Sequence, residues 1–483
     1  MAWSHLKSAK WFDNADAAVD YIHELYNQSV TQICENFSQF EKTGAASDYV
    51  PGHGCYPYIG VSVGRDDLFV DPSFAYGAIS EPGHYGTTVT APELYDEYYR
   101  EQIGLIIDRH KVSVVVGYND WPIPLPFVIE HSHAQFDVDE LARLQSKFIL
   151  PDLKRIDDAF ANATFVPNGY RPLALFSAER VDFSLQRLHH YTGTAPSYFQ
   201  NFVLLTNYQR YIDEFINHTT TDIDHHKNEN WELIGPGGIV LASHKQRRSE
   251  LPKLLPQMPA YHFTKPGKNG ITIINIGVGP SNAKTITDHV AVLRPHCWVM
   301  LGHCAGLRAS QTLGDYVLAD GYVREDHVLD DDLPKWVPVP PIAEIQQALQ
   351  KAVLQIFGKR EGELKSAIRT GTVHTTDNRN WELQSKALYE RFRQSRAIAV
   401  DMESATIAAN GFRFRVPYGT LLCISDRPIH GVIKLQAMAN EFYKNRVSHH
   451  LHVGVEAMNI LQKMDPQRLH SRKLRGFDEC PFR

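Results

Sequence analysis

Cysteine is scarce in this sequence. Its 483 residues contain six cysteines, and no two of them form a CxxC pair. Three of the six lie within apolar, strand-like runs, where a free thiol behaves as a small hydrophobic group. This pattern argues against a disulfide framework and favours a protein from a reducing compartment.

Long apolar runs and an excess of basic residues are also missing. The N-terminus has no apolar core of signal-peptide length, and no run approaches the roughly 20 apolar residues that a membrane span needs. The formal net charge is −6, so no basic excess exists to neutralise phosphates. We therefore expect a cytoplasmic protein whose partners include neither nucleic acid nor a membrane.

The sequence does contain enough residues for two folded domains. Hydrophobic residues make up 43% of it and charged residues 22%, ordinary values for a globular protein. Residues 1–175 combine an amphipathic helix over 15–43 with turn-rich, aromatic segments, which predicts an α+β domain. Residues 176–200 form a connector. In residues 201–483 continuous apolar strands alternate with helices, which predicts an α/β domain with a mostly parallel mixed sheet flanked by helices.

Two carboxylates follow two apolar strands of the predicted α/β domain. AVDMESATIA at 399–408 brings Glu403 just after a strand, and TLLCISDRPIHG at 420–431 brings Asp426. Open parallel sheets build their sites at the carboxyl ends of strands. One such acid can hold a sugar while the other handles a proton. Asp401, by contrast, equally suits a structural role as a strand-end acid that accepts backbone N–H bonds.

Two glycine-rich turns follow other strands, and their chemistry alone leaves two interpretations open. INIGVGPSNAKT at 274–285 is either a plain tight turn or, around Gly279, a backbone that approaches a ligand closely with helix N–H groups facing an anion. It lacks the third glycine of a dinucleotide fingerprint. WVMLGHCAGLR at 298–308, which contains His303, either permits close packing or forms the floor of a ligand cleft.

Isolated charges and histidines elsewhere have ordinary surface interpretations. Arg210 lies in the first turns of a predicted helix, where an arginine is usually solvated. The histidine clusters at 130–135 and 222–228 lack the spacing of zinc ligands, and the segment 218–231 reads as a polar surface loop. The basic tail around 472–475 is either solvated or folded over a phosphate.

Taken together, the motifs resemble the nucleoside phosphorylase/nucleosidase superfamily. Four motifs occur between residues 275 and 426 in the order that this superfamily shows: GVGPSNA, GHCAG, DMESA and ISD. The resemblance is closer still to the bacterial AMP nucleosidase family, which couples this catalytic domain to an unusual N-terminal domain. Four segments carry this resemblance along most of the chain: RVDFSLQRLHHYTGT, TNYQRYIDEF, TTDNRNWEL and RLHSRKLR. The first fifty residues match the family poorly.

The resemblance implies hydrolysis of AMP to adenine and ribose 5-phosphate. It makes Asp426 the acid at adenine N7 and Glu403 the group that holds the ribose hydroxyls, with Met402 beneath the sugar. His190 corresponds to the residue that, in related hexamers, reaches the 5′ side of the sugar bound in a neighbouring subunit. Residues on the ligand-facing turns and the base-lining loop complete the set: Gly279, His303, Arg379 and Trp381.

The sequence departs from the superfamily at two positions. Phosphorylases carry an Arg where this chain has Met300, and a Ser or Thr where it has His303, to hold the attacking phosphate. Arg210 still matches the other phosphate-side arginine, and it serves either the 5′-phosphate of AMP or an inhibitory phosphate. Losing one phosphate clamp favours water as the nucleophile.

Two other functions compete with this one. A purine nucleoside phosphorylase would release ribose 1-phosphate, and a nucleotide-sensing protein would bind AMP without turnover, although a sensor has no need of Asp426. No cofactor is expected for the chemistry. The resemblance further implies a hexamer that MgATP activates and phosphate inhibits, with residues 1–175 as the regulatory domain.

Overall fold

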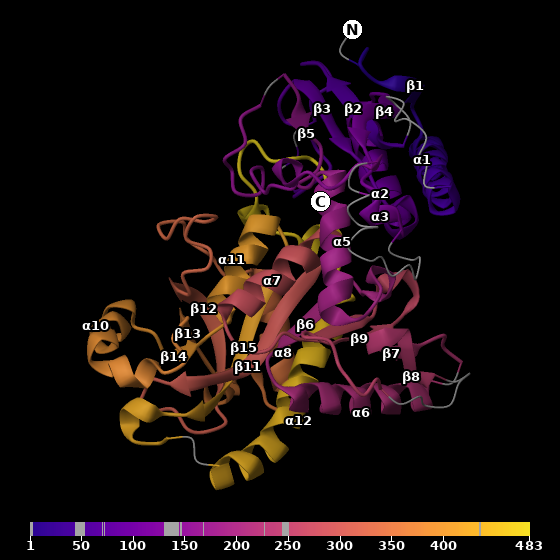
Figure 1. The fold of residues 1–483 in the computed structure, drawn as a ribbon. Coiled ribbons are helices and arrows are strands. Elements are labelled where there is room, and N and C mark those ends of the chain that lie inside the picture. Colours follow the sequence, from indigo (N-terminus) through magenta and orange to yellow (C-terminus); the bar gives the residue numbers. More distant parts are fainter. Residues whose placement is uncertain are drawn as a thin grey trace. The chain divides into compact units, whose positions relative to one another are not determined.

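The computed structural model of the chain separates into two compact units (Figure 1). It describes residues 3–43, 54–69, 71, 73–129, 144, 147–167, 169–226, 228–243, 251–433 and 436–483. The first unit comprises residues 1–187 and 476–483, and the second comprises residues 188–475. The division falls within helix α5 (Ala178–Thr192), inside the connector predicted at 176–200. Residues 476–483 belong to the first unit, although the sequence analysis placed them with the second.

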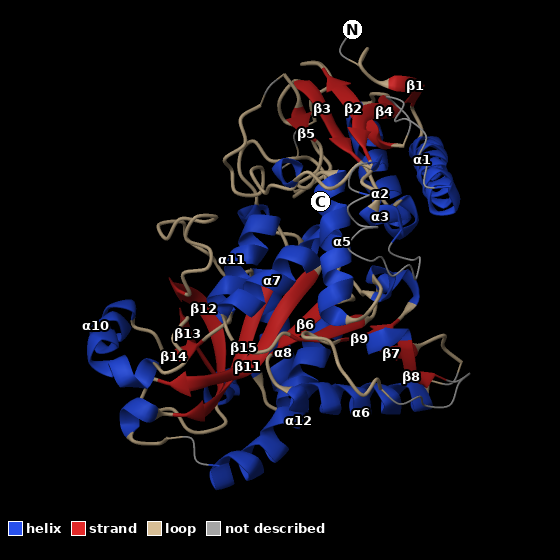
Figure 2. Ribbon diagram, in the orientation of Figure 1, coloured by secondary structure: helices blue, strands red, loops and turns tan. Residues whose placement is uncertain are grey.

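The first unit is built on a twisted sheet with helices packed beside it (Figure 2). The described strands run in the order β1-β4-β2-β3-β5, and all neighbours are antiparallel except β3 and β5. Helix α1 packs on β2 and β4 as well as on α2. The element bounds are β1 Lys7–Phe12, α1 Ala15–Thr43, β2 Cys55–Val63, β3 Gly83–Thr88, α2 Pro92–His110, β4 Val114–Pro122, α3 Pro126–Ile129 and β5 Arg171–Pro172.

The C-terminal segment 476–483 completes the core of the first unit. The backbone N–H of Phe482 donates to Leu173 O at 2.9 Å, and the Tyr98 hydroxyl donates to Arg483 O at 2.9 Å. The Phe482 ring is buried and lies edge-on to Tyr98. This unit is therefore assembled from two distant parts of the sequence.

The second unit contains a mixed sheet of ten described strands. Its order is β14-β13-β12-β15-β11-β6-β10-β9-β7-β8, and β14 also pairs with β11, so five strands close into a ring. Pairing is parallel along β10-β6-β11-β15 and along β12-β13-β14, and antiparallel elsewhere. The bounds are β6 Phe202–Thr206, β7 Glu232–Gly235, β8 Ile239–Ser243, β9 Ala260–Thr264, β10 Ile271–Asn275, β11 Cys297–Gly306, β12 Tyr316–Glu325, β13 Ile368–Thr376, β14 Ala399–Asp401 and β15 Tyr418–Asp426.

Helices cover both faces of this sheet. The Trp298 indole N–H donates to Ile407 O of α11, whereas Leu301, on the other face of the same strand, packs against Gly454 of α12. A Cβ on Gly454 would lie 2.3 Å from a Leu301 methyl group, so only glycine permits this close approach. The helices are α6 Gln209–His225, α7 Pro280–Val290, α8 Ala343–Ile356, α9 Leu364–Ala367, α10 Ser385–Ser395, α11 Ser404–Phe414, α12 Gln436–Leu461 and α13 Pro466–Leu469.

The alternation of apolar strands and helices expected in residues 201–483 is present, but two local features differ from the expectation. Strand β7, only four residues long, was not foreseen. The segment predicted as a surface loop at 218–231 instead continues α6 as far as His225. Its threonines do not break the helix because their hydroxyls donate to carbonyls one turn earlier, as Thr219 does to Phe215 O at 2.7 Å.

The described residues contain no helix with the length and apolar character needed to cross a bilayer. They also contain no group of three or more His, Cys, Asp or Glu side chains placed to hold a metal ion. The histidine cluster at 130–135 lies outside the described residues. In the basic tail, Arg472 and Lys473 are exposed.

Candidate functional site

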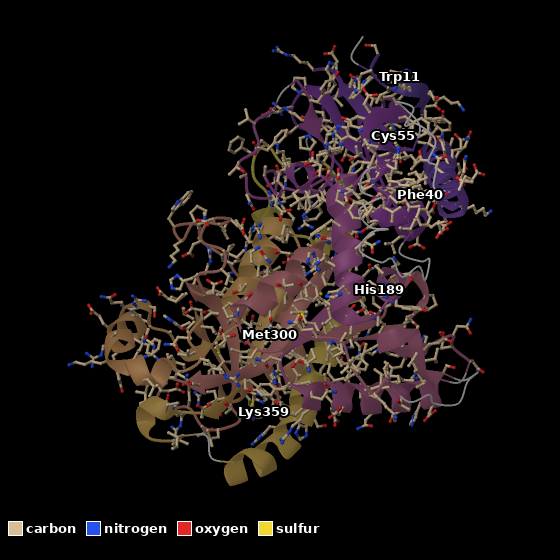
Figure 3. The ribbon with its side chains drawn as sticks, in the orientation of Figure 1. Trp11, Phe40, Cys55, His189, Met300 and Lys359 are labelled. Atoms are coloured by element: carbon tan, nitrogen blue, oxygen red, sulfur yellow. The ribbon has the colours of Figure 1, made fainter. Side chains whose placement is uncertain are left out.

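The predicted acids end two strands that lie on either side of β11. Ala305 of β11 pairs with Asp426 of β15 and with Val400 of β14, the residue before Asp401. Strand β14 runs antiparallel to β11 whereas β15 runs parallel to it, so the carboxyl ends of β14 and β15 point in opposite directions. Asp401 and Asp426 nevertheless both lie near the end of β11, where both charges act on the Cys304 thiol. Met300, from the same β11 strand, lies inside the second unit (Figure 3).

Glu403 is held at the start of α11 by two donors from distant segments. The backbone N–H of Gly279 donates to its Oε1 at 2.7 Å, and Asn207 Nδ2 donates to its Oε2 at 3.0 Å. Only 1% of Glu403 is exposed. Gly279 has a φ of +113°, so its N–H reaches the carboxylate through a backbone conformation that favours glycine. Gly279 and Glu403, predicted separately as ligand-binding residues, thus meet directly.

Asp401 has the structural contacts that the sequence analysis considered for it. Its Oδ2 accepts the backbone N–H groups of Glu403 and Ser404, at 3.3 and 2.8 Å, and also the Ser404 hydroxyl. Its Oδ1 accepts the Thr375 hydroxyl at 2.5 Å. Asp401 therefore fixes the turn that presents Glu403.

Burial raises the pKa of both carboxyls, and the two groups influence each other. For Glu403 the causes are desolvation first and the Asp401 charge second, and they raise its pKa to about 8. Desolvation also raises the pKa of Asp401, but its hydrogen-bond donors oppose the rise. Asp401 accepts four hydrogen bonds, more than Glu403 does, so its ionised form is the better stabilised of the two.

Asp426 is half-buried at the end of β15. The Ser425 hydroxyl donates to its Oδ1 at 2.5 Å. Beside it, burial raises the pKa of the Cys304 thiol, and the charge of Asp426 contributes to that rise. This thiol therefore stays neutral, as expected of a small buried side chain.

His303 lies close to two tyrosines at the start of α6. Its ring is edge-on to Tyr208, with centroids 4.7 Å apart, and its Nε2 is 3.5 Å from the Tyr211 hydroxyl. That hydroxyl lies 2.6 Å from His450 Nδ1, and His450 Nε2 lies 3.0 Å from Leu421 O. Burial lowers the pKa of His450 to about 3, so its ring is neutral. Because Nε2 must donate to the carbonyl, Nδ1 accepts the Tyr211 proton.

Trp381 and Arg379 follow β13, in the segment predicted to line the base. Trp381 is buried in an apolar cluster with Ala305, Val400, Leu388 and Phe392. Ala305 pairs with Asp426, so this cluster adjoins the strand end that carries the acid. Arg379 is exposed in the loop before Trp381.

The remaining predicted residues lie at less enclosed positions. Arg210 is exposed in the first turn of α6, three residues after Asn207. Met402 is half-buried between Asp401 and Glu403. His190 is exposed on α5, with its ring edge-on to Tyr191, and no described contact joins it to Glu403 or Asp426.

Asn207 is the residue of this site that the sequence analysis missed. It follows the apolar run FVLLT directly, and a polar residue at a strand end is the signal that could have found it. The sequence analysis singled out Arg210 in the same segment instead. The contact of Asn207 with Glu403, 196 positions away, is visible only in three dimensions.

Comparisons with known proteins cover both units. Residues 17–172 match the family model of the bacterial AMP nucleoside phosphorylase N-terminus, and residues 241–449 match the phosphorylase superfamily. AMP nucleosidases from two strains of Escherichia coli are each 46% identical over 473 residues, 96% of this chain and 98% of the relative. A solved AMP nucleosidase from Bacteroides thetaiotaomicron is 29% identical, covers 59% of this chain and 98% of its own, and has a TM-score of 0.42. This chain belongs to the bacterial AMP nucleosidase family, as the identity along nearly its whole length establishes.

Proposed function

We propose that this protein hydrolyses the N-glycosidic bond of AMP to give adenine and ribose 5-phosphate. The observation that carries the proposal is the 46% identity to AMP nucleosidases, because it spans both units rather than the catalytic fold alone. The site geometry is consistent with it. Two carboxyl groups of different environment, Glu403 and Asp426, follow β14 and β15, which both pair with the end of β11.

Asp426 is the proposed acid. A purine anion is a poor leaving group, so a proton delivered to N7 assists cleavage of the C1′–N9 bond. General acid catalysis of this kind contributes typically about 10²–10⁴-fold. The electron pair of the broken bond passes to the purine. Ser425, whose hydroxyl donates to Oδ1, fixes the orientation of the carboxyl group.

Glu403 is the proposed ligand of the ribose hydroxyls. In the ligand-free protein its raised pKa keeps a proton on it near neutral pH. Ribose hydroxyls donate hydrogen bonds to the ionised form, so AMP binding favours release of that proton. The ionised carboxylate then stabilises the positive charge that develops on the sugar as the bond breaks.

The other ligand contacts follow the family pattern. We assign Met402 to the face of the sugar, Gly279 and His303 to the ligand-facing turns, and Arg210 to the 5′-phosphate or an inhibitory phosphate. Arg379 and Trp381 are the proposed base contacts, and His190 is proposed to reach the sugar of a neighbouring subunit. These roles are consistent with a homohexamer.

Water rather than phosphate is the proposed nucleophile. Met300 is buried in β11 where a phosphorylase carries a phosphate-binding arginine, and it supplies no charge. The main alternative is a purine nucleoside phosphorylase, which would use phosphate as the nucleophile. A nucleotide sensor without turnover is the alternative from another class.

Regulation forms a separate part of the proposal. No cofactor takes part in the chemistry, while MgATP activates the enzyme and phosphate inhibits it, through the first unit. We place the protein in the cytoplasm, with AMP as its partner and without nucleic acid or membrane contacts. Activity assays with and without MgATP and phosphate test the regulatory part independently of the reaction.

Product identification tests the reaction. Incubation with AMP, adenosine and IMP, each with and without phosphate, should release adenine and ribose 5-phosphate from AMP alone, without any requirement for phosphate. Release of ribose 1-phosphate only when phosphate is present would identify a phosphorylase instead. Absence of any cleavage, with AMP still bound, would identify a sensor.

Replacement of the acid tests the mechanism. Asp426→Asn should abolish cleavage while leaving AMP binding largely intact, because the amide cannot deliver the proton. Asp320→Asn, an exposed acid on β12, is the matched control and should keep wild-type turnover. Wild-type turnover by Asp426→Asn would exclude Asp426 as the general acid.

A further inference from the structure

The side chain of Asn207 is fixed by Glu403 in one orientation. Asn207 immediately follows β6, and its Nδ2 lies 3.0 Å from Glu403 Oε2. Nδ2 is the donor in this contact, so the NH₂ group of the amide faces Glu403. The carbonyl oxygen Oδ1 is therefore turned away from Glu403, toward the neighbouring strand β11.

Oδ1 of Asn207 is buried and accepts no hydrogen bond from any described residue. A buried acceptor of this kind is costly to leave without a donor, and such groups call for an explanation. Water is a suitable donor, because it is small and offers two hydrogens.

Gly302 of β11 lies beside Oδ1. A Cβ built on Gly302 would lie 3.5 Å from Oδ1, so the glycine leaves this part of β11 without a side chain. The adjoining Met300 methyl group is apolar and offers no hydrogen bond. Neither Gly302 nor Met300 therefore offers Oδ1 a side-chain donor.

We propose that Asn207 orients the water molecule that attacks C1′ of AMP. This inference rests on the proposed function and adds the residue that positions the nucleophile. In the proposed function Glu403 binds ribose hydroxyls, one of which is on C2′, the carbon next to C1′. The amide group of Asn207 joins Glu403 to a water bound at Oδ1, so we place that water on the C1′ side of the proposed ribose site.

Asn207 acts as a hydrogen-bond acceptor and takes up no proton. One O–H of the water donates to Oδ1, which turns an oxygen lone pair toward C1′. The lone pair forms the new C1′–O bond as the C1′–N9 pair leaves with adenine, which receives the Asp426 proton at N7. The water then retains one hydrogen as the product hydroxyl and releases the other to solvent. Over the cycle that released proton replaces the one lost from Asp426.

Competition between water and methanol tests this role, because it reports on the nucleophile alone. Wild-type enzyme turning over AMP in dilute methanol should give almost only ribose 5-phosphate. In Asn207→Ala, kcat should fall about 100-fold with KM for AMP changed less than about threefold, the signature of lost orientation. The fraction of methyl riboside 5-phosphate should rise several-fold, measured by NMR of the products.

A second variant separates the two functions of the amide. Asn207→Asp keeps an acceptor oxygen but loses the donor to Glu403, so it should retain the wild-type preference for water even where kcat falls. Gln209→Ala, at an exposed neighbouring position, is the matched control and should change neither quantity.

Three outcomes would overturn the inference. They are a wild-type product ratio in Asn207→Ala, an equal rise of the methyl product in both variants, and a change in KM without a change in kcat. The last would assign Asn207 to the placement of Glu403 only. Failure of the proposed function is recognised separately, because the wild-type protein would then release no ribose 5-phosphate from AMP.

Discussion

The Thr375 hydroxyl donates to Asp401 Oδ1 at 2.5 Å, across the parallel pair β13 and β14. The same hydroxyl oxygen accepts the backbone N–H of Ala405, in the first turn of α11. Thr375 therefore joins two strands to the helix whose start carries Glu403. Asp401, which holds the turn, and Glu403, the proposed ribose ligand, are therefore distinct in role although they are only two residues apart.

This difference predicts opposite effects for substitutions of the two acids. Glu403→Gln should lose most of its activity and little stability, because it keeps the size of the side chain and removes the charge. It should also abolish the proton release on AMP binding that calorimetry in buffers of different ionisation enthalpy detects in the wild type near pH 7. Asp401→Ala should instead lower the free energy of unfolding, by about 3–5 kcal/mol, because it leaves several buried donors without an acceptor.

Thermal unfolding and turnover, measured together, check the comparison. Glu403→Ala should lose far more activity than Asp401→Ala does per folded molecule. Equal losses of specific activity by the two variants, with unchanged stability, would contradict the assignment of Glu403 to the ribose.

His374 predicts that the second unit loses stability in acid. Burial lowers its pKa to about 4, and neither ring nitrogen hydrogen-bonds to any described residue. The unfolded chain binds a proton at this histidine below pH 6.5, whereas the folded chain does not, so stability falls as the pH drops from about 6.5 to 4. At about pH 4 the free energy of unfolding is lowered by about 3 kcal/mol through this histidine. His374→Leu should remove it and keep the packing against Phe392.

Denaturant unfolding of the second unit at pH 7.5, 6 and 5 measures this effect. The variant should show a shallower decline than the wild type, while exposed His225→Leu should follow the wild type. A variant with the wild-type decline would mean that the acid lability comes from other buried histidines, such as His262 or His450.

Asp182 predicts the opposite pH dependence in the first unit. It is buried and accepts hydrogen bonds from Tyr56 and Thr90, at 2.6 and 2.7 Å. Desolvation raises its pKa from 3.8 to about 7. Between these values the folded chain holds a proton that the unfolded chain releases, so stability falls as the pH rises from about 4 to 7, by about 4 kcal/mol. Asp182→Asn should abolish this loss.

Hydrogen exchange of the amides in β2 and the first turns of α5, corrected for its intrinsic pH dependence, checks this prediction. Protection should fall toward pH 7 in the wild type and stay level in Asp182→Asn. A parallel fall in both proteins would exclude Asp182 as the titrating group.

The C-terminal segment predicts a strong contrast between two phenylalanines. Phe482 is 2% exposed in the core of the first unit, so Phe482→Ala should destabilise that unit by about 3–5 kcal/mol. Phe477, five residues earlier, is 90% exposed, and Phe477→Ala should change stability by less than about 0.5 kcal/mol. Chemical unfolding followed in the first unit measures both, and equal effects would contradict the packing described.

The sequence indicated those parts of the fold that depend on local pattern. Apolar runs followed by polar residues located the strands, and hence Glu403 and Asp426 at their ends. Residues that depend on distant partners were not accessible in this way. The pairing of β14 with β11 and the contact of Asn207 with Glu403 join segments far apart in the chain, and no periodicity specifies them. The continuation of α6 was missed for a different reason. The polar, threonine-rich composition of this segment is typical of a loop, but the threonine hydroxyls donate to carbonyl groups of the preceding helical turn.

The return of residues 476–483 to the first unit has a consequence for the order of synthesis. The ribosome makes residues 1–187 first, yet Phe482 and its neighbours are added only after the whole of residues 188–475. Chains ordinarily fold domain by domain from the N-terminus as they emerge. Here the core of the first unit stays incomplete until the second unit has been translated, so the first unit closes only in a chain whose second unit is already made.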